Sequence, residues 1–142
     1  MRFEPVLKIL VAEDDPGVRT LLNRILTRQG FAVDCAGDGV EALDRLAAAP
    51  YDVVLLDLAM PRMSGADVLC RLEEHGRADI LSRIIVVTAA SVKEVSKLQR
   101  VAVIRKPFDL HELMGAIHRV TGRAMAAAIG APPSGEPELR PG

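Results

Sequence analysis

Five short apolar runs alternate with helix-like segments along most of this 142-residue chain. The runs are apolar on both faces, which is typical of strands covered by helices on either side. Strands that alternate with helices pair in parallel, and right-handed crossovers then wind the chain outward from the middle of the sheet. The sequence therefore predicts an α/β domain with five helices and a doubly wound, five-stranded parallel sheet in the order 2-1-3-4-5. The predicted strands are 7–12, 31–36, 53–56, 84–87 and 101–104.

Capping residues predict where the helices begin and end. In a capping box, a polar residue caps the first turn and an acid three residues later reaches back. Asp15 followed by Pro16 predicts a further start, with proline at the first helical position. The four capping boxes begin at Asp38, Ser64, Ser91 and Asp109, and the predicted ends lie at Gly30, Pro50, Gly76 and Gly122.

The composition of the chain changes near residue 123. The segment 123–142 is rich in Ala, Pro and Gly and has few large apolar residues. We therefore expect a folded domain over residues 1–122 and a flexible tail over residues 123–142, with the first tail residues extending the last helix. We expect no second domain after it.

The net charge, the apolar runs and the cysteines limit which partners and which cellular location we expect. The formal net charge is −1, which argues against direct binding of nucleic acid. No apolar run approaches the roughly 20 residues of a membrane-spanning helix, and the N-terminus lacks the apolar stretch of a signal peptide. Cys35 and Cys70 lack the spacing of a metal site. We expect both to be reduced and buried, which fits a cytoplasmic protein.

Four of the predicted strands end on polar residues that suit phosphoryl transfer. The carboxyl ends of parallel strands meet at one edge of a sheet, where ligands bind. Residues far apart in the sequence are therefore predicted to converge there, with the acids at the switch point between the first and third strands. These residues are Glu13 and Asp14, Asp57, Thr88, and Arg105 with Lys106.

Three carboxylates at one edge need a counter-charge. At about 5 Å and an effective dielectric near 20, each pair repels by roughly 3 kcal/mol. Mg²⁺ prefers such hard oxygen ligands and also accepts phosphate oxygens. An aspartate can act as a nucleophile, Lys106 is the predicted fixed cation, and Thr88 can donate to a phosphoryl oxygen. The sequence thus predicts a Mg²⁺-dependent phosphoryl-transfer site.

The motifs that hold these residues resemble the receiver domain of bacterial two-component response regulators, over roughly residues 6–121. They are ILVAEDDPGVRTLL, LLDLAMPRMSG, VVTA and KPF, in this order. The resemblance implies a flavodoxin-like fold and Mg²⁺ as the cofactor. It also implies a phosphoryl group taken from a phosphohistidine of a sensor histidine kinase or histidine phosphotransfer protein, and signalling through a downstream protein target.

The resemblance also implies roles for single residues around the metal. Asp57 matches the phosphoacceptor, and Asp14 matches a direct metal ligand. Glu13 matches an acid that assists through water, in place of the commoner Asp. The backbone carbonyl of Ala59 matches a further metal ligand.

The second half of the chain combines matches with departures. Thr88 and Lys106 match the hydroxyl and lysine that sense the phosphoryl group, and the Lys106–Pro107 bond matches one that is cis in the family. Val103 stands where the family usually has Tyr or Phe, so a switch here must use backbone or loop movement. The short interval from Thr88 to Lys106 predicts that helix 4 or its exit loop is cut back by about one turn. In the family, helix 4, strand 5 and helix 5 form the face used by partners and homodimers.

Three functions from different classes remain open at this stage. The first is a non-enzymatic, phosphorylation-dependent switch. The second is a receiver-fold scaffold that signals without phosphorylation, or a phosphate sink. The third is a metal-dependent phosphatase, which fits less well because Asp57 is followed by Leu58 and Ala59 instead of a second acid two residues on.

Overall fold

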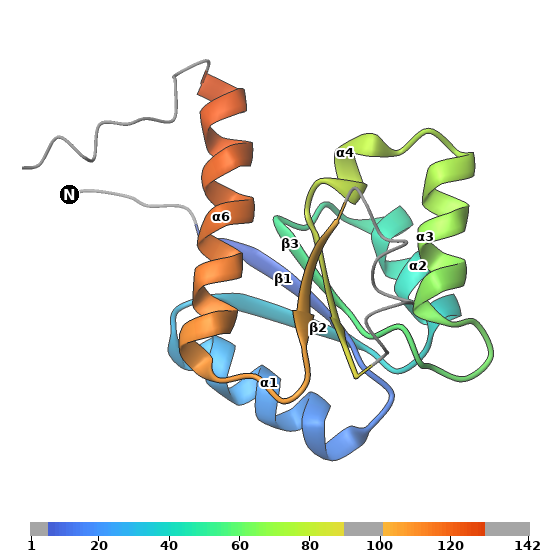
Figure 1. Cartoon of the computed structure of the whole chain (residues 1–142). Coiled ribbons are helices and arrows are strands. Elements are labelled where there is room, and N and C mark those ends of the chain that lie inside the picture. Colours follow the sequence, from blue (N-terminus) through green and yellow to red (C-terminus); the bar gives the residue numbers. More distant parts are fainter. Residues whose placement is uncertain (1–5, 90–100, 130–142) are drawn as a thin grey trace, which may run out of the picture.

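The computed structural model describes residues 6–89 and 101–129 of the chain, with five strands in one parallel sheet. The strand order is β2-β1-β3-β4-β5, as predicted (Figure 1). Each predicted strand agrees with the structure to within one residue at either end. The strands are β1 (Lys8–Ala12), β2 (Ala32–Ala36), β3 (Val53–Leu56), β4 (Ile84–Thr88) and β5 (Ala102–Arg105).

Capping contacts confirm most of the predicted helix starts. Asp15 accepts from the backbone N–H groups of Gly17 and Val18, and Ser64 forms a complete capping box. Asp109 also shares reciprocal contacts with the residue three positions on. The start predicted at Ser91 lies outside the described residues. The helices are α1 (Pro16–Arg28), α2 (Gly39–Ala48), α3 (Gly65–Glu74), α4 (Ala78–Leu81) and α6 (Leu110–Ile129).

Two helical features differ from the sequence prediction. The short α4 was not predicted; it follows Gly76, which ends α3 with a φ of 66°, and it buries Ile80 and Leu81. The end predicted at Gly122 is wrong, because α6 continues to Ile129. This continuation agrees with the expectation that the first residues of the segment 123–142 extend the last helix. The shortening predicted after β4 falls on residues 90–100, outside the described residues.

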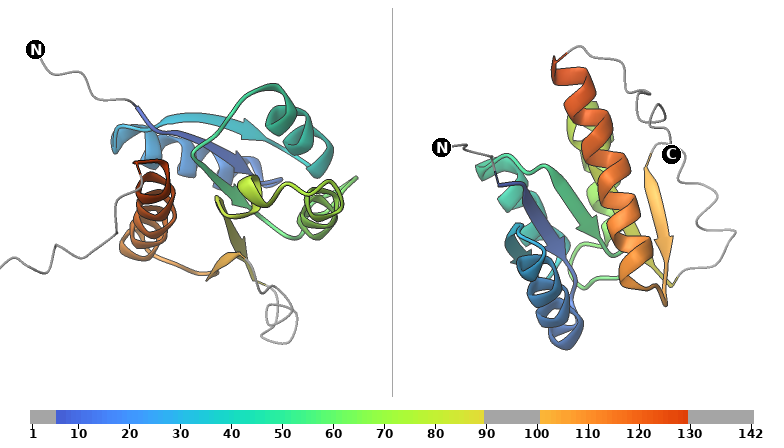
Figure 2. Two further views of the ribbon diagram at one scale, coloured as in Figure 1. Left: turned by 90° about the horizontal axis from the view of Figure 1, so that it is seen from above. Right: turned by 90° about the vertical axis from the view of Figure 1, so that its left-hand side faces the viewer.

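Helices cover both faces of the sheet in three layers (Figures 1 and 2). One apolar cluster joins the sheet to α1 and α6 through residues such as Leu26 and Ile117. The other joins the sheet to α2, α3 and α4 through residues such as Leu46 and Leu72. In Figure 2, α6 extends beyond the ends of the strands. No helix within residues 6–89 and 101–129 is long and apolar enough to cross a membrane.

The prediction that both cysteines are buried is wrong. Both are free thiols, but Cys70 is exposed and Cys35 is half-buried. Cys70 lies on the outer side of the amphipathic α3, and Cys35 lies on β2, which is an edge strand. Edge strands receive less cover than the central strands, so an apolar run there does not guarantee burial.

Candidate functional site

The sheet's hydrogen-bond ladder positions the residues that follow its strands. The backbone N–H of Glu13 donates to Ala36 O over 3.0 Å, and that of Asp57 donates to Ala12 O over 3.0 Å. Further along the same edge, the N–H of Lys106 donates to Thr88 O over 2.9 Å. The predicted site residues are therefore held by regular sheet pairing, and they meet at one edge because all five strands are parallel.

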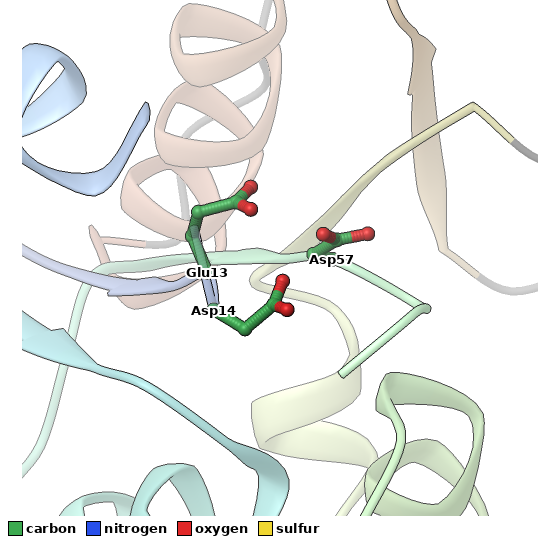
Figure 3. A group of neighbouring side chains, drawn as sticks. All are labelled: Glu13, Asp14 and Asp57. Atoms are coloured by element: carbon green, nitrogen blue, oxygen red, sulfur yellow. The ribbon is translucent and has the colours of Figure 1, made fainter. Parts of the chain in front are cut away.

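The three predicted acids come together at this edge. Glu13, Asp14 and Asp57 each offer one carboxylate oxygen, and these oxygens all lie within 4.8 Å of one another. Figure 3 shows the three side chains pointing into one space, from the end of β1 and the end of β3. Glu13 and Asp57 are buried, whereas Asp14 is exposed. The acidic cluster therefore meets solvent at Asp14.

Lys106 brings one positive charge to the acids. Its Nζ atom lies 3.2 Å from Glu13 Oε1 and 3.4 Å from Asp57 Oδ2. Burial alone would lower the pKa of Lys106, but the neighbouring carboxylates of Asp57 and Glu13 outweigh it and raise the pKa. The lysine therefore stays protonated at neutral pH and faces both buried acids.

A single lysine leaves the acids under-compensated. Burial raises the pKa of Glu13, the backbone N–H of Asp15 partly opposes that rise, and the charge of Asp57 adds to it. A divalent cation among the three carboxylates would supply the missing charge. Carboxylate oxygens with one exposed member form a donor set that fits Mg²⁺, which takes oxygen ligands and retains water.

Thr88 and Ala59 lie where the strand ends place them. Thr88 is the buried last residue of β4, between the ends of β3 and β5. Ala59 is exposed in the loop after β3, and its backbone N–H donates to Asp57 Oδ1 over 3.2 Å. The Lys106–Pro107 bond is cis, as the resemblance implied. Val103 is half-buried against the cluster on the α2, α3 and α4 face.

Two glycines allow close backbone contact beside the site. A Cβ atom on Gly65 would lie 2.2 Å from the carbonyl oxygen of Asp57. One on Gly39 would lie 2.2 Å from the carbonyl oxygen of Met63, to which the Gly39 N–H donates over 2.9 Å. The glycines let α2 and α3 begin against the loop that follows Asp57, and so fix the path of that loop.

Sequence reasoning missed Arg19, which contacts the backbone of the acidic pair. Its Nη1 atom donates to the carbonyl oxygen of Glu13 over 2.7 Å and lies 3.4 Å from that of Asp14. An arginine early in a helix has the same sequence pattern as a solvated surface residue. The only available signal was its position one turn after the Asp15 cap, from which a helical side chain points back toward the N-terminus.

Comparison with known proteins places this geometry in a family. The model of the response regulator receiver domain matches residues 9–118. The response regulator MprA of Mycobacterium tuberculosis strain H37Rv is 39% identical over 120 residues, which cover 82% of this chain and 51% of MprA. The chain thus spans about half the length of the curated relatives it matches.

Solved structures agree with the family match. The response regulator TrrA from Thermotoga maritima, in a complex with Mg²⁺ and BeF, is 31% identical with a TM-score of 0.71, covering 81% of this chain and 99% of TrrA. The receiver domain of a Francisella response regulator is 28% identical with a TM-score of 0.74, covering 83% of this chain and 98% of that domain. This chain belongs to the response regulator receiver domain family and hence to two-component signalling.

Proposed function

We propose that this protein is a phosphorylation-controlled signalling switch whose phosphoacceptor is Asp57. A carboxylate oxygen of Asp57 attacks the phosphorus of a phosphohistidine on a sensor histidine kinase or a histidine phosphotransfer protein. The P–O bond to Asp57 forms as the P–N bond to the imidazole breaks, and the imidazole keeps the electron pair of that bond. The convergence of Glu13, Asp14 and Asp57 within 4.8 Å carries this proposal.

The neighbouring residues would bind the metal and contact the phosphoryl group. Asp14 and Asp57 would hold Mg²⁺ directly, with the Ala59 carbonyl, while Glu13 assists through water. When bound, Mg²⁺ supplies positive charge that offsets both the acids and the transferring phosphoryl group. Lys106 contacts Glu13 and Asp57, at 3.2 and 3.4 Å, and would form an ion pair with the phosphoryl oxygens after transfer. Thr88 would donate its hydroxyl to a phosphoryl oxygen.

The Mg²⁺-bound relative supports the metal assignment. TrrA was solved with Mg²⁺ and BeF, and it shares 31% identity with this chain. The donor set here, two buried acids and one exposed acid on adjacent strands, suits the same ion. A downstream protein, and a homodimer formed through helix 4, strand 5 and helix 5 of the family pattern, would then read the phosphorylated state in the cytoplasm.

Acetyl phosphate tests the acceptor directly. We expect wild-type protein with Mg²⁺ to gain the mass of one phosphoryl group, and Asp57→Asn to gain none. Asp44→Asn is the matched control, because Asp44 is an exposed acid on α2. The adduct should appear on Asp44→Asn as on wild type, and EDTA should abolish it.

Other outcomes favour the competing functions. A chain that takes no phosphoryl group from acetyl phosphate or from phosphohistidine would be a phosphorylation-independent scaffold. An adduct that forms and decays without changing any protein contact would make the domain a phosphate sink. Sustained hydrolysis of phosphate esters would make it a metal-dependent phosphatase, against the non-enzymatic role proposed here.

A further inference from the structure

We propose that Arg19 is a positioning residue that fixes the backbone of Glu13 and Asp14, and with it the direction of the Asp14 carboxylate, for Mg²⁺. This inference rests on the proposed function and adds a residue outside the strand-end motifs. Arg19 lies in α1, and its guanidinium reaches back to the corner between β1 and α1. It contacts the backbone of the acids and leaves their carboxylate oxygens free for a metal.

The hydrogen bonds explain why an anchor is needed at this corner. The N–H of Glu13 is tied to β2 through Ala36 O, and Arg19 holds the Glu13 carbonyl on the other side of the residue over 2.7 Å. The Glu13 carboxylate has partners of its own, the N–H of Asp15 and Lys106. The Asp14 carboxylate has no hydrogen bond or ion pair among residues 6–89 and 101–129. Its direction is therefore set by its backbone, which Arg19 contacts at 3.4 Å.

The loop between β2 and α2 makes room for the guanidinium. A Cβ atom on Gly37 would lie 3.2 Å from Arg19 Nη1, so a larger residue there would press on it. The same loop is held on its other side, because the Gly37 N–H donates to Glu41 Oε1 over 2.8 Å. Arg19 thus lies between two loops, and it is half-buried and not freely solvated. Gly37→Ala offers a way to displace the guanidinium without removing its charge.

The charge of Arg19 and its contact with the backbone of Glu13 and Asp14 should have opposite effects on Mg²⁺ affinity, so an experiment can separate them. If Arg19 acted only as a nearby positive charge, its removal would reduce repulsion of the cation and tighten binding. If it acts through the backbone of Glu13 and Asp14, its removal loosens the ligands and weakens binding. Outer contacts of this kind typically change metal affinity by about 10-fold or more. Screened charge effects over several ångströms are smaller, so the positional effect should prevail.

The test is titration of Mg²⁺ by calorimetry into wild-type, Arg19→Met, Arg19→Lys and Gly37→Ala proteins. Arg24→Met is the matched control, because Arg24 is an exposed arginine on the same helix with no hydrogen bond or ion pair among the described residues. We expect about 10-fold weaker binding for Arg19→Met, a smaller loss for Gly37→Ala, and partial recovery in Arg19→Lys. Arg24→Met should bind at least as tightly as wild type. Melting temperatures without Mg²⁺ confirm that each variant is folded.

The outcomes separate this inference from the proposed function. Tighter or unchanged binding in a folded Arg19→Met protein would overturn the positioning role while leaving Asp57 as the acceptor. Equal losses in Arg19→Met and Arg24→Met would also overturn it, because the loss would then not depend on the contact between Arg19 and the backbone of Glu13 and Asp14. Failure of wild-type protein to bind Mg²⁺ at all would overturn both. A loss confined to Arg19→Met and Gly37→Ala, with recovery in Arg19→Lys, supports the inference.

Discussion

The two ends of this parallel sheet differ in how their charged side chains are paired. At the carboxyl ends of the strands, Glu13, Asp14 and Asp57 face Lys106, and Glu13 has a raised pKa, chiefly through burial. Around the amino ends of β1 and β3, Lys8 forms an ion pair with Asp34 from the middle of β2, and Asp52 accepts a hydrogen bond from the backbone N–H of Lys8. Both regions rest on the same strands, so the difference lies in the side chains and not in the backbone.

The network at the amino end consists of Lys8, Asp34 and Tyr51. The Tyr51 hydroxyl donates to Asp34 Oδ2 over 2.7 Å, and Lys8 Nζ lies 3.6 Å from the same oxygen. Lys8 Nζ also lies 5.1 Å from the centre of the Tyr51 ring, a cation–π distance. The Tyr51 hydroxyl, followed by Lys8, holds the pKa of Asp34 below its usual value, despite some opposing burial.

The comparison shows where the sheet keeps charge available for a ligand. At the amino end, the ion pair of Lys8 with Asp34 places a positive charge beside the acid within the fold itself. Unbalanced acids at the carboxyl end destabilise the metal-free fold and give an incoming cation its binding energy. Close backbone packing around Gly39 and Gly65 must therefore hold the carboxyl end together.

Gly65→Ala should have the largest effect on stability. Its Cβ atom would lie 2.2 Å from Asp57 O and 2.8 Å from Leu58 Cα, and backbone atoms cannot move aside as a flexible side chain can. We expect a loss of about 3 kcal/mol in the free energy of unfolding, measured in urea.

Gly115→Ala is the control, because its nearest neighbour would be the end of the Arg119 side chain at 3.7 Å. The control should be neutral or gain up to about 1 kcal/mol through helix propensity. A tolerated Gly65→Ala would show that packing does not hold this end.

Neutralising one acid at each end should change stability with opposite signs. In metal-free protein at pH 7, Glu13→Gln removes a buried charge beside Asp57 and should stabilise the fold by about 1 kcal/mol. Asp34→Asn weakens the contacts with Tyr51 and Lys8 and should destabilise it by about 1 kcal/mol. Chemical denaturation in EDTA measures both. Destabilisation by both variants would remove the contrast between the two ends.

Most of the fold could be predicted because local patterns and tertiary packing agree. Alternating apolar runs gave all five strands, and the caps at Asp15, Asp38 and Ser64 gave helix starts. The missed α4 has only four residues, and its N-cap, Arg77, makes no side-chain capping bond, so it left no capping signal. The end predicted at Gly122 was wrong because a lone glycine only weakens a helix and does not stop it.

The site was predictable where it depends on strand ends, and unpredictable where it depends on side-chain reach. Glu13, Asp57 and Lys106 converge because parallel topology requires it. Arg19 contributes through the direction in which its side chain leaves α1, and Gly37 through the space it leaves. Neither property follows from residue identity and spacing alone, because both depend on how a helix packs beside a loop.

The stability of metal-free protein should depend on pH in opposite ways at the two ends. The pKa of Glu13 is raised above its ordinary 4.5, so its contribution is fully present below that value and is lost as the pH rises through the folded-state pKa. The pKa of Asp34 is lowered below its ordinary 3.8, so its contribution is present above 3.8 and is lost as the pH falls through the folded-state pKa. Melting curves in EDTA from below pH 3.8 up to neutral pH measure both, with expected differences of about 1 kcal/mol or less. Glu13→Gln should flatten the loss toward neutral pH, and Asp34→Asn the loss toward acid. Unchanged profiles in both variants would contradict the assignment.

Arg62 offers the smallest and most specific test of how the carboxyl end is held. Its backbone has a φ of 63°, and its side chain forms an exposed ion pair with Asp38, with Nη2 at 2.9 Å from Oδ2. Arg62→Ala loses the ion pair and keeps the unfavourable backbone, so it should cost about 0.5 kcal/mol. Arg62→Gly loses the same pair but relieves the left-handed conformation, and should be about 1 kcal/mol more stable than Arg62→Ala. Urea unfolding of the two variants gives the order. Glycine is normally the more destabilising of these two residues, so an alanine variant of higher stability would show that the left-handed backbone at residue 62 does not constrain this loop.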